Sequence, residues 1–94
     1  MSTVIVERAH QLGRAGAREK AQQVAERLAE KYDVMYRWHG DTLAVRRAGA
    51  EGIIVVDDST IHIELKLGMV FSALKGTIKR EMEAALDKRL ASSS

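Results

Sequence analysis

The chain has no cysteine and no proline, and it has a single tryptophan among its 94 residues. Without cysteine the fold needs no disulfide, and neither thiol chemistry nor a thiolate metal site is possible. Low-complexity blocks, internal repeats and a linker that could divide the chain are missing as well. A chain of this length can bury one modest core, so we expect one domain.

Long apolar runs and a signal sequence are also missing. The longest uncharged apolar run, Leu67 to Leu74, is far shorter than the ~20 residues that span a bilayer. Residues 1–8 do not show the basic and then apolar pattern of a secretory signal peptide. We therefore expect a cytoplasmic protein without a transmembrane segment.

The chain does not carry a strong charge of either sign. Fifteen basic and 13 acidic residues are interleaved, giving a net charge of +2, so the pI of 9.2 reflects a near balance. We expect no nucleic-acid partner, because such proteins carry a clustered basic surface. Arg46-Arg47 and Lys79-Arg80 are small basic clusters that we interpret as solvated surface, with contact to phosphate or lipid headgroups as the alternative.

The hydrophobic pattern predicts five strands and two helices. Residues at every second position alternate between apolar and polar in the strands, most clearly over 61–67, and the helices show the 3.6-residue period. The expected strands cover residues 3–8, 34–39, 42–46, 52–56 and 61–67, and the expected helices cover about 15–32 and 69–90.

These elements predict a two-layer α+β fold. The last four strands are joined by short turns, which favours an antiparallel meander, and the polar face of strand 61–67 leaves one side of the sheet wet. Each helix has one apolar stripe, so both helices share the other side. Strand 3–8 is placed beside strand 61–67 and antiparallel to it, with strand 52–56 at the centre. We expect one domain over 1–91 and a disordered tail over 92–94.

The second helix allows three interpretations. Its apolar stripe consists of Phe71, Leu74, Ile78, Met82, Ala85 and Leu86. We expect this stripe to cover the sheet, with Leu74 and Ile78 buried at its centre. A long amphipathic helix can instead lie on a hydrophobic surface. It can also enclose an apolar cavity over a curved sheet, as in the helix-grip lipid carriers, by analogy of fold alone.

Candidate contact residues come from the few large apolar side chains. Trp38 is in phase with Val34 and Tyr36, which predicts a ring packed under a helix; the alternative is a ring that contacts an apolar partner. The candidate ligand or partner contacts are Trp38, Tyr36, Phe71 and Met82.

Catalytic and metal-binding patterns are not recognisable. His10, His39 and His62 do not have the spacing of a local metal motif, and the predicted strand order puts two strands between the last two. Asp57 and Asp58 are adjacent in a turn, where both face water rather than form a general acid–base pair. No phosphate-binding loop or nucleophile motif is present. We expect no enzyme activity, no metal and no cofactor.

Four short segments carry a resemblance to a known family. In chain order they are residues 10–13 (His-Gln-Leu-Gly), 36–43 (Tyr-Arg-Trp-His-Gly-Asp-Thr-Leu), 52–56 (Gly-Ile-Ile-Val-Val) and 65–68 (Leu-Lys-Leu-Gly). In this order and spacing they resemble the small polyhydroxyalkanoate (polyhydroxyalkanoic acid) system proteins, which are encoded with the genes of bacterial polyester storage granules. The resemblance covers nearly the whole chain. That family has no established biochemical activity.

The resemblance implies a setting and a set of motif positions without an assigned role. These positions are His10, Trp38, Gly40, Asp41, Gly52 and Gly68. We expect His10 to anchor the loop before the first helix. The implied function is that of a non-enzymatic accessory protein, associated with cytoplasmic granules or regulatory, that contacts the polyester granule surface or granule-associated proteins. The alternative is a binding module for an apolar, fatty-acyl-like ligand held between the C-terminal helix and the sheet. The oligomeric state stays open between monomer and dimer.

Overall fold

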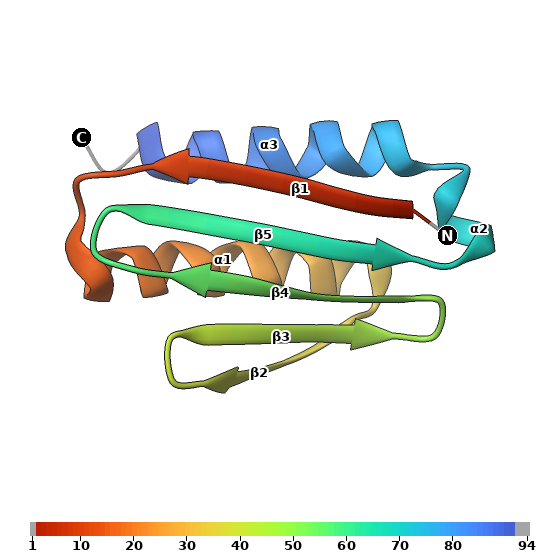
Figure 1. The fold of residues 1–94 in the computed structure, drawn as a ribbon, viewed down its shortest axis with the longest axis horizontal. Helices are drawn as coiled ribbons and strands as arrows, with labels where there is room; N and C mark the ends of the chain where they lie inside the picture. Colours follow the sequence, from red (N-terminus) through yellow and green to blue (C-terminus); the bar gives the residue numbers. More distant parts are fainter. Residues whose placement is uncertain (1, 92–94) are drawn as a thin grey trace.

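Residues 2–91 are described by the computed structural model, in which a five-stranded sheet lies in front of two long helices (Figure 1). The expected disordered tail, 92–94, lies outside the described residues. In chain order the elements are β1 (Ser2–Ala9), α1 (Gly13–Tyr32), β2 (Met35–His39), β3 (Thr42–Arg47), β4 (Ala50–Val56), β5 (Thr60–Leu67), α2 (Met69–Ser72) and α3 (Lys75–Ala91).

The sheet is antiparallel throughout and has the order β1-β5-β4-β3-β2. This order confirms the predicted one, including β4 at the centre and β1 beside β5. The register pairs Val4 with Leu65 at one edge and Trp38 with Leu43 at the other. Tight turns join β2 to β3 and β3 to β4, and Gly40 and Gly49 in these turns adopt φ values of +60° and +87°.

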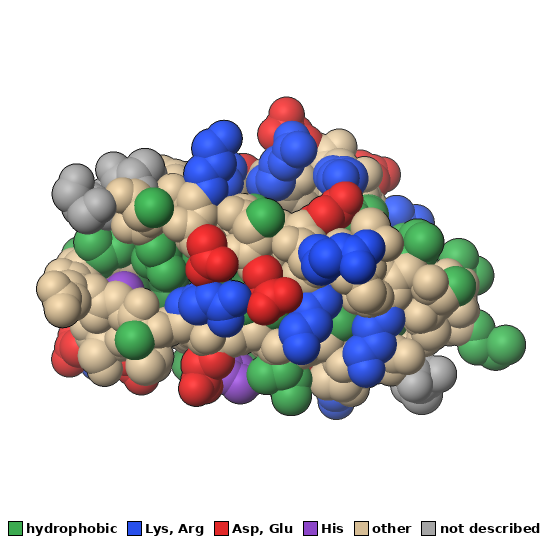
Figure 2. All heavy atoms as spheres, turned by 90° about the horizontal axis from the view of Figure 1, so that it is seen from above, with side chains coloured by type: hydrophobic (Ala, Val, Ile, Leu, Met, Phe, Trp, Pro, Cys, Tyr) green, Lys and Arg blue, Asp and Glu red, His purple; other side chains and the backbone are tan. Residues whose placement is uncertain are grey.

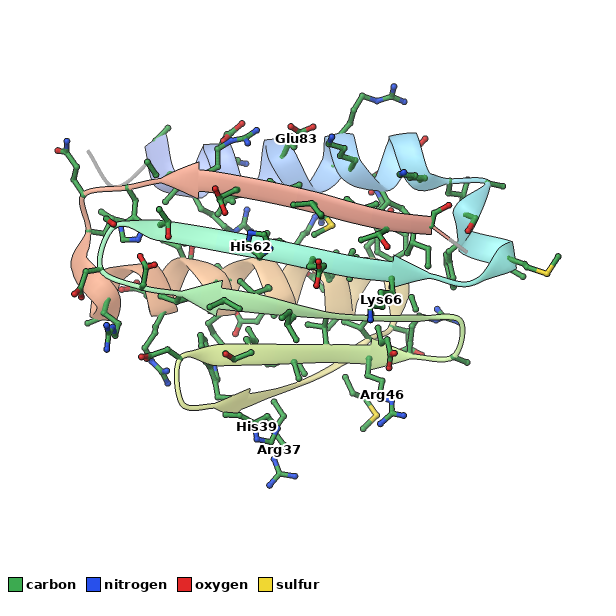
Figure 3. The ribbon with its side chains drawn as sticks, in the orientation of Figure 1. Arg37, His39, Arg46, His62, Lys66 and Glu83 are labelled. Atoms are coloured by element: carbon green, nitrogen blue, oxygen red, sulfur yellow. The ribbon has the colours of Figure 1, made fainter. Side chains whose placement is uncertain are left out.

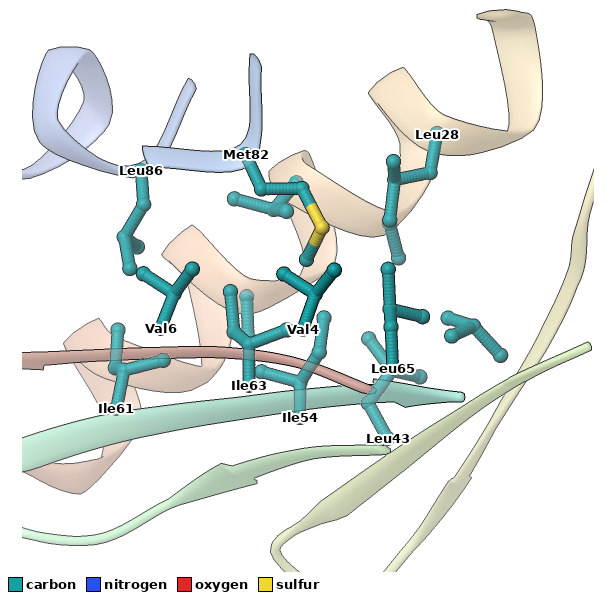
Figure 4. Close-up of a cluster of buried hydrophobic side chains, with 14 of the residues drawn as sticks. Val4, Val6, Leu28, Leu43, Ile54, Ile61, Ile63, Leu65, Met82 and Leu86 are labelled. Carbon is teal, nitrogen blue, oxygen red and sulfur yellow. The ribbon is translucent and has the colours of Figure 1, made fainter. Parts of the chain in front are cut away.

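The core lies between the sheet and the helices, and both long helices cover the same face. Alanines on α1 let this helix approach the strands closely, while α3 inserts larger side chains over β1 and β5 (Figure 4). The buried residues are Val4, Val6, Ala17, Ala21, Val24, Ala25, Leu28, Leu43, Val45, Ile54, Val56, Ile61, Ile63, Leu65, Leu67, Ile78, Met82 and Leu86. The two-layer prediction is therefore confirmed. The opposite side of the sheet, which we call the open face, is not covered by any described element (Figure 1).

The second predicted helix is not continuous. It divides into α2 and α3, with Ala73 and Leu74 between them. The prediction that Leu74 is buried at the centre of the stripe is wrong, because its side chain is 45% exposed, whereas Ile78 is buried as expected.

The hydrogen bonds explain this break. The amide and the hydroxyl group of Ser72 both donate to the carbonyl oxygen of Gly68 at 2.9 Å, and a side-chain bond of this kind often bends a helix. The amide of Leu74 donates to the carbonyl oxygen of Phe71, only three residues back, at 2.9 Å. The chain turns here, so Phe71 packs at the end of the sheet while Ile78, four residues beyond Leu74, begins the stripe over the core.

Candidate functional site

The two most exposed large apolar side chains of the described residues lie on α2, and a third exposed one lies directly after it. Met69 is 87% exposed, Val70 78% and Leu74 45%. We call these three residues the apolar tip. Hydrophobic side chains protrude at the end of the molecule where α2 lies (Figure 2). Contiguous exposed apolar groups of this kind mark contact sites for partners or surfaces, because water is released when they are covered.

The apolar tip is held in place from below by Phe71 and Arg47. The guanidinium carbon of Arg47 lies 4.9 Å from the centroid of the Phe71 ring. The same guanidinium group donates to the carbonyl oxygens of Tyr32 at 2.6 Å and Ala48 at 3.0 Å. Arg47 thus links the end of α1, the β3–β4 turn and α2. Phe71, a predicted contact residue, acts here as the anchor of the tip and is itself half-buried.

Two glycines allow this close approach. The amide of Gly68 donates to the carbonyl oxygen of Gly49 at 2.8 Å. A Cβ atom on Gly68 would lie 3.1 Å from that oxygen, and one on Gly49 would lie 3.2 Å from the Phe71 ring. The motif position Gly68 therefore serves the packing of α2 against the β3–β4 turn.

An apolar cavity lies beneath α2, but it is small. Its volume is about 30 Å³, and its lining includes Leu28, Val45, Leu65, Phe71 and Ile78. Pockets for small molecules usually measure about 300–1,000 Å³, and a single water already needs about 10–15 Å³. The predicted contact residue Met82 is 1% exposed and packs in the core (Figure 4). This cavity is therefore too small to hold a fatty-acyl chain.

A wider groove runs between α1 and α3. It has a volume of about 460 Å³, and its charged lining includes Lys31, Glu81, Lys88 and Arg89. The hydroxyl group of Tyr32 and the ammonium group of Lys31 both donate to the carboxylate of Glu81. Burial is the larger cause and the bond to Glu81 the smaller one that together raise the pKa of Tyr32 to about 12. The bond from Lys31 lowers the pKa of Glu81. Tyr32 therefore stays protonated at neutral pH and joins the two helices.

Trp38 and Tyr36 pack against α1. The indole N–H of Trp38 donates to Gln22 at 2.8 Å, and the Arg18 guanidinium carbon lies 4.1 Å from the ring centroid. The amide nitrogen of Gln22 donates to the hydroxyl group of Tyr36 at 3.4 Å. The predicted packing of the tryptophan under a helix is thus observed, with the ring half-buried. Sequence reasoning missed Gln22 and Arg18, because both lie on the polar side of α1 and nothing local pairs them with Trp38.

The motif residues Gly40 and Asp41 belong to the same contact. Arg18 donates to the carbonyl oxygen of Gly40 and, at 3.3 Å, to the carboxylate of Asp41, and Arg14 lies 3.1 Å from the other carboxylate oxygen. The β2–β3 turn is thereby fastened to the first turns of α1.

His10 anchors the loop before α1, as predicted. Its Nδ1 accepts a hydrogen bond from the amide of Leu12 at 3.1 Å, and its Nε2 donates to the carbonyl oxygen of Asp57 at 3.2 Å. Its own amide donates to Ser59 at 2.8 Å. Bonds from the amide of Ser59 and from Thr60 lower the pKa of Asp57. Asp57 therefore orders the β4–β5 turn.

Gly52 serves the packing of the sheet. A Cβ atom there would lie 2.4 Å from the carbonyl oxygen of Glu64 and 2.6 Å from the side chain of Leu65. His39 and His62 lie on the open face with two strands between them, as predicted (Figure 3). The Nδ1 atom of His62 instead lies 2.8 Å from a carboxylate oxygen of Glu7. Within residues 2–91, no group of three or more His, Asp or Glu side chains is arranged to hold a metal ion.

The motif residues therefore stabilise the fold. The apolar tip lies at one end of a sheet that helices cover on one face. This arrangement defines a small α+β protein that offers contact surfaces. The chain belongs to the family described as "Putative polyhydroxyalkanoic acid system protein", whose model matches residues 4–90. Searches of curated proteins and of solved structures gave no match. Among the described residues, no helix is long and apolar enough to cross a membrane.

Proposed function

We propose that this protein is a non-enzymatic accessory protein of the polyhydroxyalkanoate storage system that attaches to the polyester surface of cytoplasmic granules. Family membership supports the storage system as the setting. The apolar tip supports the contact, and the exposure of Met69 and Val70 on an anchored element is the observation that carries the proposal.

The size of the tip favours a reversible attachment. Its exposed area corresponds to about two full side chains, and burying each contributes about 1.5–3 kcal/mol. A gross gain of roughly 3–6 kcal/mol, reduced by the entropy lost on binding, corresponds to an affinity no better than about millimolar for one tip. Such a protein can exchange between granule and solution, as a regulatory role requires.

The titratable groups of the grooves and turns support a non-enzymatic role. Tyr32, Lys31 and Glu81 satisfy one another between the two long helices, and His10 bridges two loops. A catalytic acid or base needs access to a substrate proton. These side chains are engaged in holding elements together.

Co-sedimentation tests the proposal. A measurable fraction of the tagged protein should pellet with granules from polyester-accumulating cells, and none should pellet from cells that make no polyester. The double variant Met69→Asp/Val70→Asp should lose at least about 90% of the pelleted fraction, because burying two unpaired carboxylates against the polymer is strongly unfavourable.

Two controls keep the result specific. Met69→Leu/Val70→Leu retains an apolar tip and should pellet like the wild type. Ala84→Asp adds a charge at an exposed position of α3 and should also pellet. Full pelleting of the double aspartate variant would contradict the tip as the contact. Wild-type protein that stays in the supernatant and binds a fatty-acyl ligand saturably would support the ligand carrier instead.

A further inference from the structure

The first turns of α3 carry three cationic side chains directly beside the apolar tip. Lys75 follows Leu74 in the chain, Lys79 and Arg80 lie about one turn further along, and all three are exposed. We call these three residues the α3 cations. Side chains of a helix lean towards its amino-terminal end, which in α3 is the end at the tip. Lysine and arginine side chains gather beside the apolar side chains that protrude at this end of the molecule (Figure 2).

The α3 cations have no partner of opposite charge, whereas the carboxylates that follow them on α3 are engaged. Glu81 accepts a hydrogen bond from Lys31. Glu83 and Asp87 lie 3.0 Å and 2.8 Å from the guanidinium group of Arg8. Within residues 2–91, no ion pair or side-chain hydrogen bond involves an α3 cation. Their positive charge is therefore available to a group outside the chain.

The stability of α3 does not explain the position of these cations. The amino-terminal end of a helix carries a partial positive charge, so cations are unfavourable there and carboxylates are favourable. The first turn of α3 contains no acidic residue, and its first residue is Lys75. Neutral side chains at the three positions should therefore leave the fold intact.

Two further cations lie on the other side of the apolar tip, at the end of the sheet. Arg46 and Lys66 line a shallow hollow together with Gly68, the residue that precedes Met69. Figure 3 shows both side chains towards the end of the sheet where the tip lies. Glu51 pairs with both residues in the register, so it offsets part of their charge. The sheet side thus contributes less positive charge than α3 does.

We infer that the tip end is a peripheral binding site for a layer of anionic phospholipids. The apolar tip enters between the headgroups, and the α3 cations contact their phosphate groups. A purely apolar surface would leave the cations without a partner, and a soluble anion would leave the tip in water, whereas an anionic lipid layer satisfies both. The inference rests on the proposed function for the tip as the contact, and it names the chemistry of the surface that the tip end recognises.

The charges should provide a large share of the affinity. Each basic residue close to an anionic membrane strengthens binding about fivefold, so the three α3 cations together give on the order of 100-fold. They act together because Lys75 and Arg80 are only about 7.5 Å apart along the helix axis, less than the screening length of about 10 Å at 0.1 M salt.

Co-sedimentation of the full chain with phospholipid vesicles tests the inference without polyester. One set of vesicles contains phosphatidylcholine alone, and the other contains equal parts of phosphatidylcholine and phosphatidylglycerol. The wild type should bind the anionic vesicles at least about 20-fold more tightly than the neutral ones. The triple variant Lys75→Gln/Lys79→Gln/Arg80→Gln should lose this preference. Met69→Asp/Val70→Asp should bind neither set, because its tip no longer enters the lipid layer.

A matched control separates the position of the charges from the net charge. Lys20→Gln/Arg37→Gln/Lys88→Gln removes three cations from α1, β2 and the far part of α3, and it should bind anionic vesicles within about threefold of the wild type, because distant charges are screened. Circular dichroism of each variant confirms that it is folded. Equal binding of the wild type to both sets of vesicles, binding to neither, or equal losses in the two triple variants would overturn the inference.

The two proposals can fail separately. Wild-type protein that pellets with granules but does not prefer anionic vesicles would reject the lipid layer and leave the granule attachment standing. Wild-type protein that prefers anionic vesicles but does not pellet with granules would reject the granule attachment and leave the lipid site standing.

Discussion

At the residue scale, two glycines in regular elements have opposite surroundings. A Cβ atom at Gly52 would meet the backbone of β5 at 2.4 Å, whereas one at Gly76 in α3 has nothing within 4 Å. Gly52→Ala should therefore lower the free energy of unfolding by about 1–3 kcal/mol, the cost of overpacking. Gly76→Ala should raise it by roughly 0.5–1 kcal/mol, because alanine loses less backbone entropy in a helix. Urea unfolding of both variants measures the difference. Equal effects would contradict the close approach at Gly52.

The bond between Lys31 and Glu81 predicts a pH dependence. The pKa of Glu81 is lowered in the folded protein, first by Lys31 and then by Tyr32. A lowered carboxyl pKa contributes stability above the unfolded pKa, and this contribution is lost as the pH falls through the folded value. Glu81→Gln should cost on the order of 0.5–1 kcal/mol at pH 7, as for surface ion pairs. The cost should be smaller at pH 3.

Urea melts of wild type and Glu81→Gln at both pH values provide the measurement. Lys20→Gln changes one charge on α1 outside this contact and serves as the control. A difference between wild type and Glu81→Gln that grows towards pH 3 would show that Glu81 is not held as a carboxylate by Lys31 and Tyr32.

Several residue roles could not be predicted from the sequence. The alternation of residues placed Trp38 towards the helix layer, but its partners Gln22 and Arg18 come from the polar side of α1, and their contacts depend on the tertiary structure. Arg47 was interpreted as solvated surface, whereas it packs on Phe71 and binds the carbonyl oxygen of Tyr32. Local patterns do not report which distant backbone groups a long side chain reaches.

At the element scale, the break between α2 and α3 separates two classes of apolar side chain. Leu86 is fully buried in α3, while Leu74 is part of the apolar tip. Leu86→Ala should lower the free energy of unfolding by about 2–5 kcal/mol, the range for core truncations. Leu74→Ala should change it by less than about 0.5 kcal/mol, as for surface positions. Thermal or urea melts of the two leucine variants provide the comparison. A large loss of stability in Leu74→Ala would contradict the exposed position of Leu74.

Periodicity predicted the strands and the sheet order well, because short turns and strict alternation leave few arrangements of β2 to β5. It failed at residues 73–74 for a physical reason. The apolar spacing of Phe71, Leu74 and Ile78 is compatible with one helix, but the bond from Ser72 to Gly68 and the contact between Phe71 and Arg47 turn the first part away from the core. The apolar tip exists because of this turn.

At the scale of the whole molecule, the pairing of β1 with β5 affects how the sheet can form during synthesis. Of the five strands, Ser2–Ala9 is made first, and it forms all its sheet bonds with the one that is made last, from Ala9 with Thr60 to Ser2 with Leu67. The other neighbouring strands are consecutive and are joined by short turns, so their pairings close early and with little loss of entropy. Strand β1 therefore stays without its partner until β5 has been made. The sheet is therefore completed late. Helix α3, which packs over β1, is made only after β1 and β5 can pair.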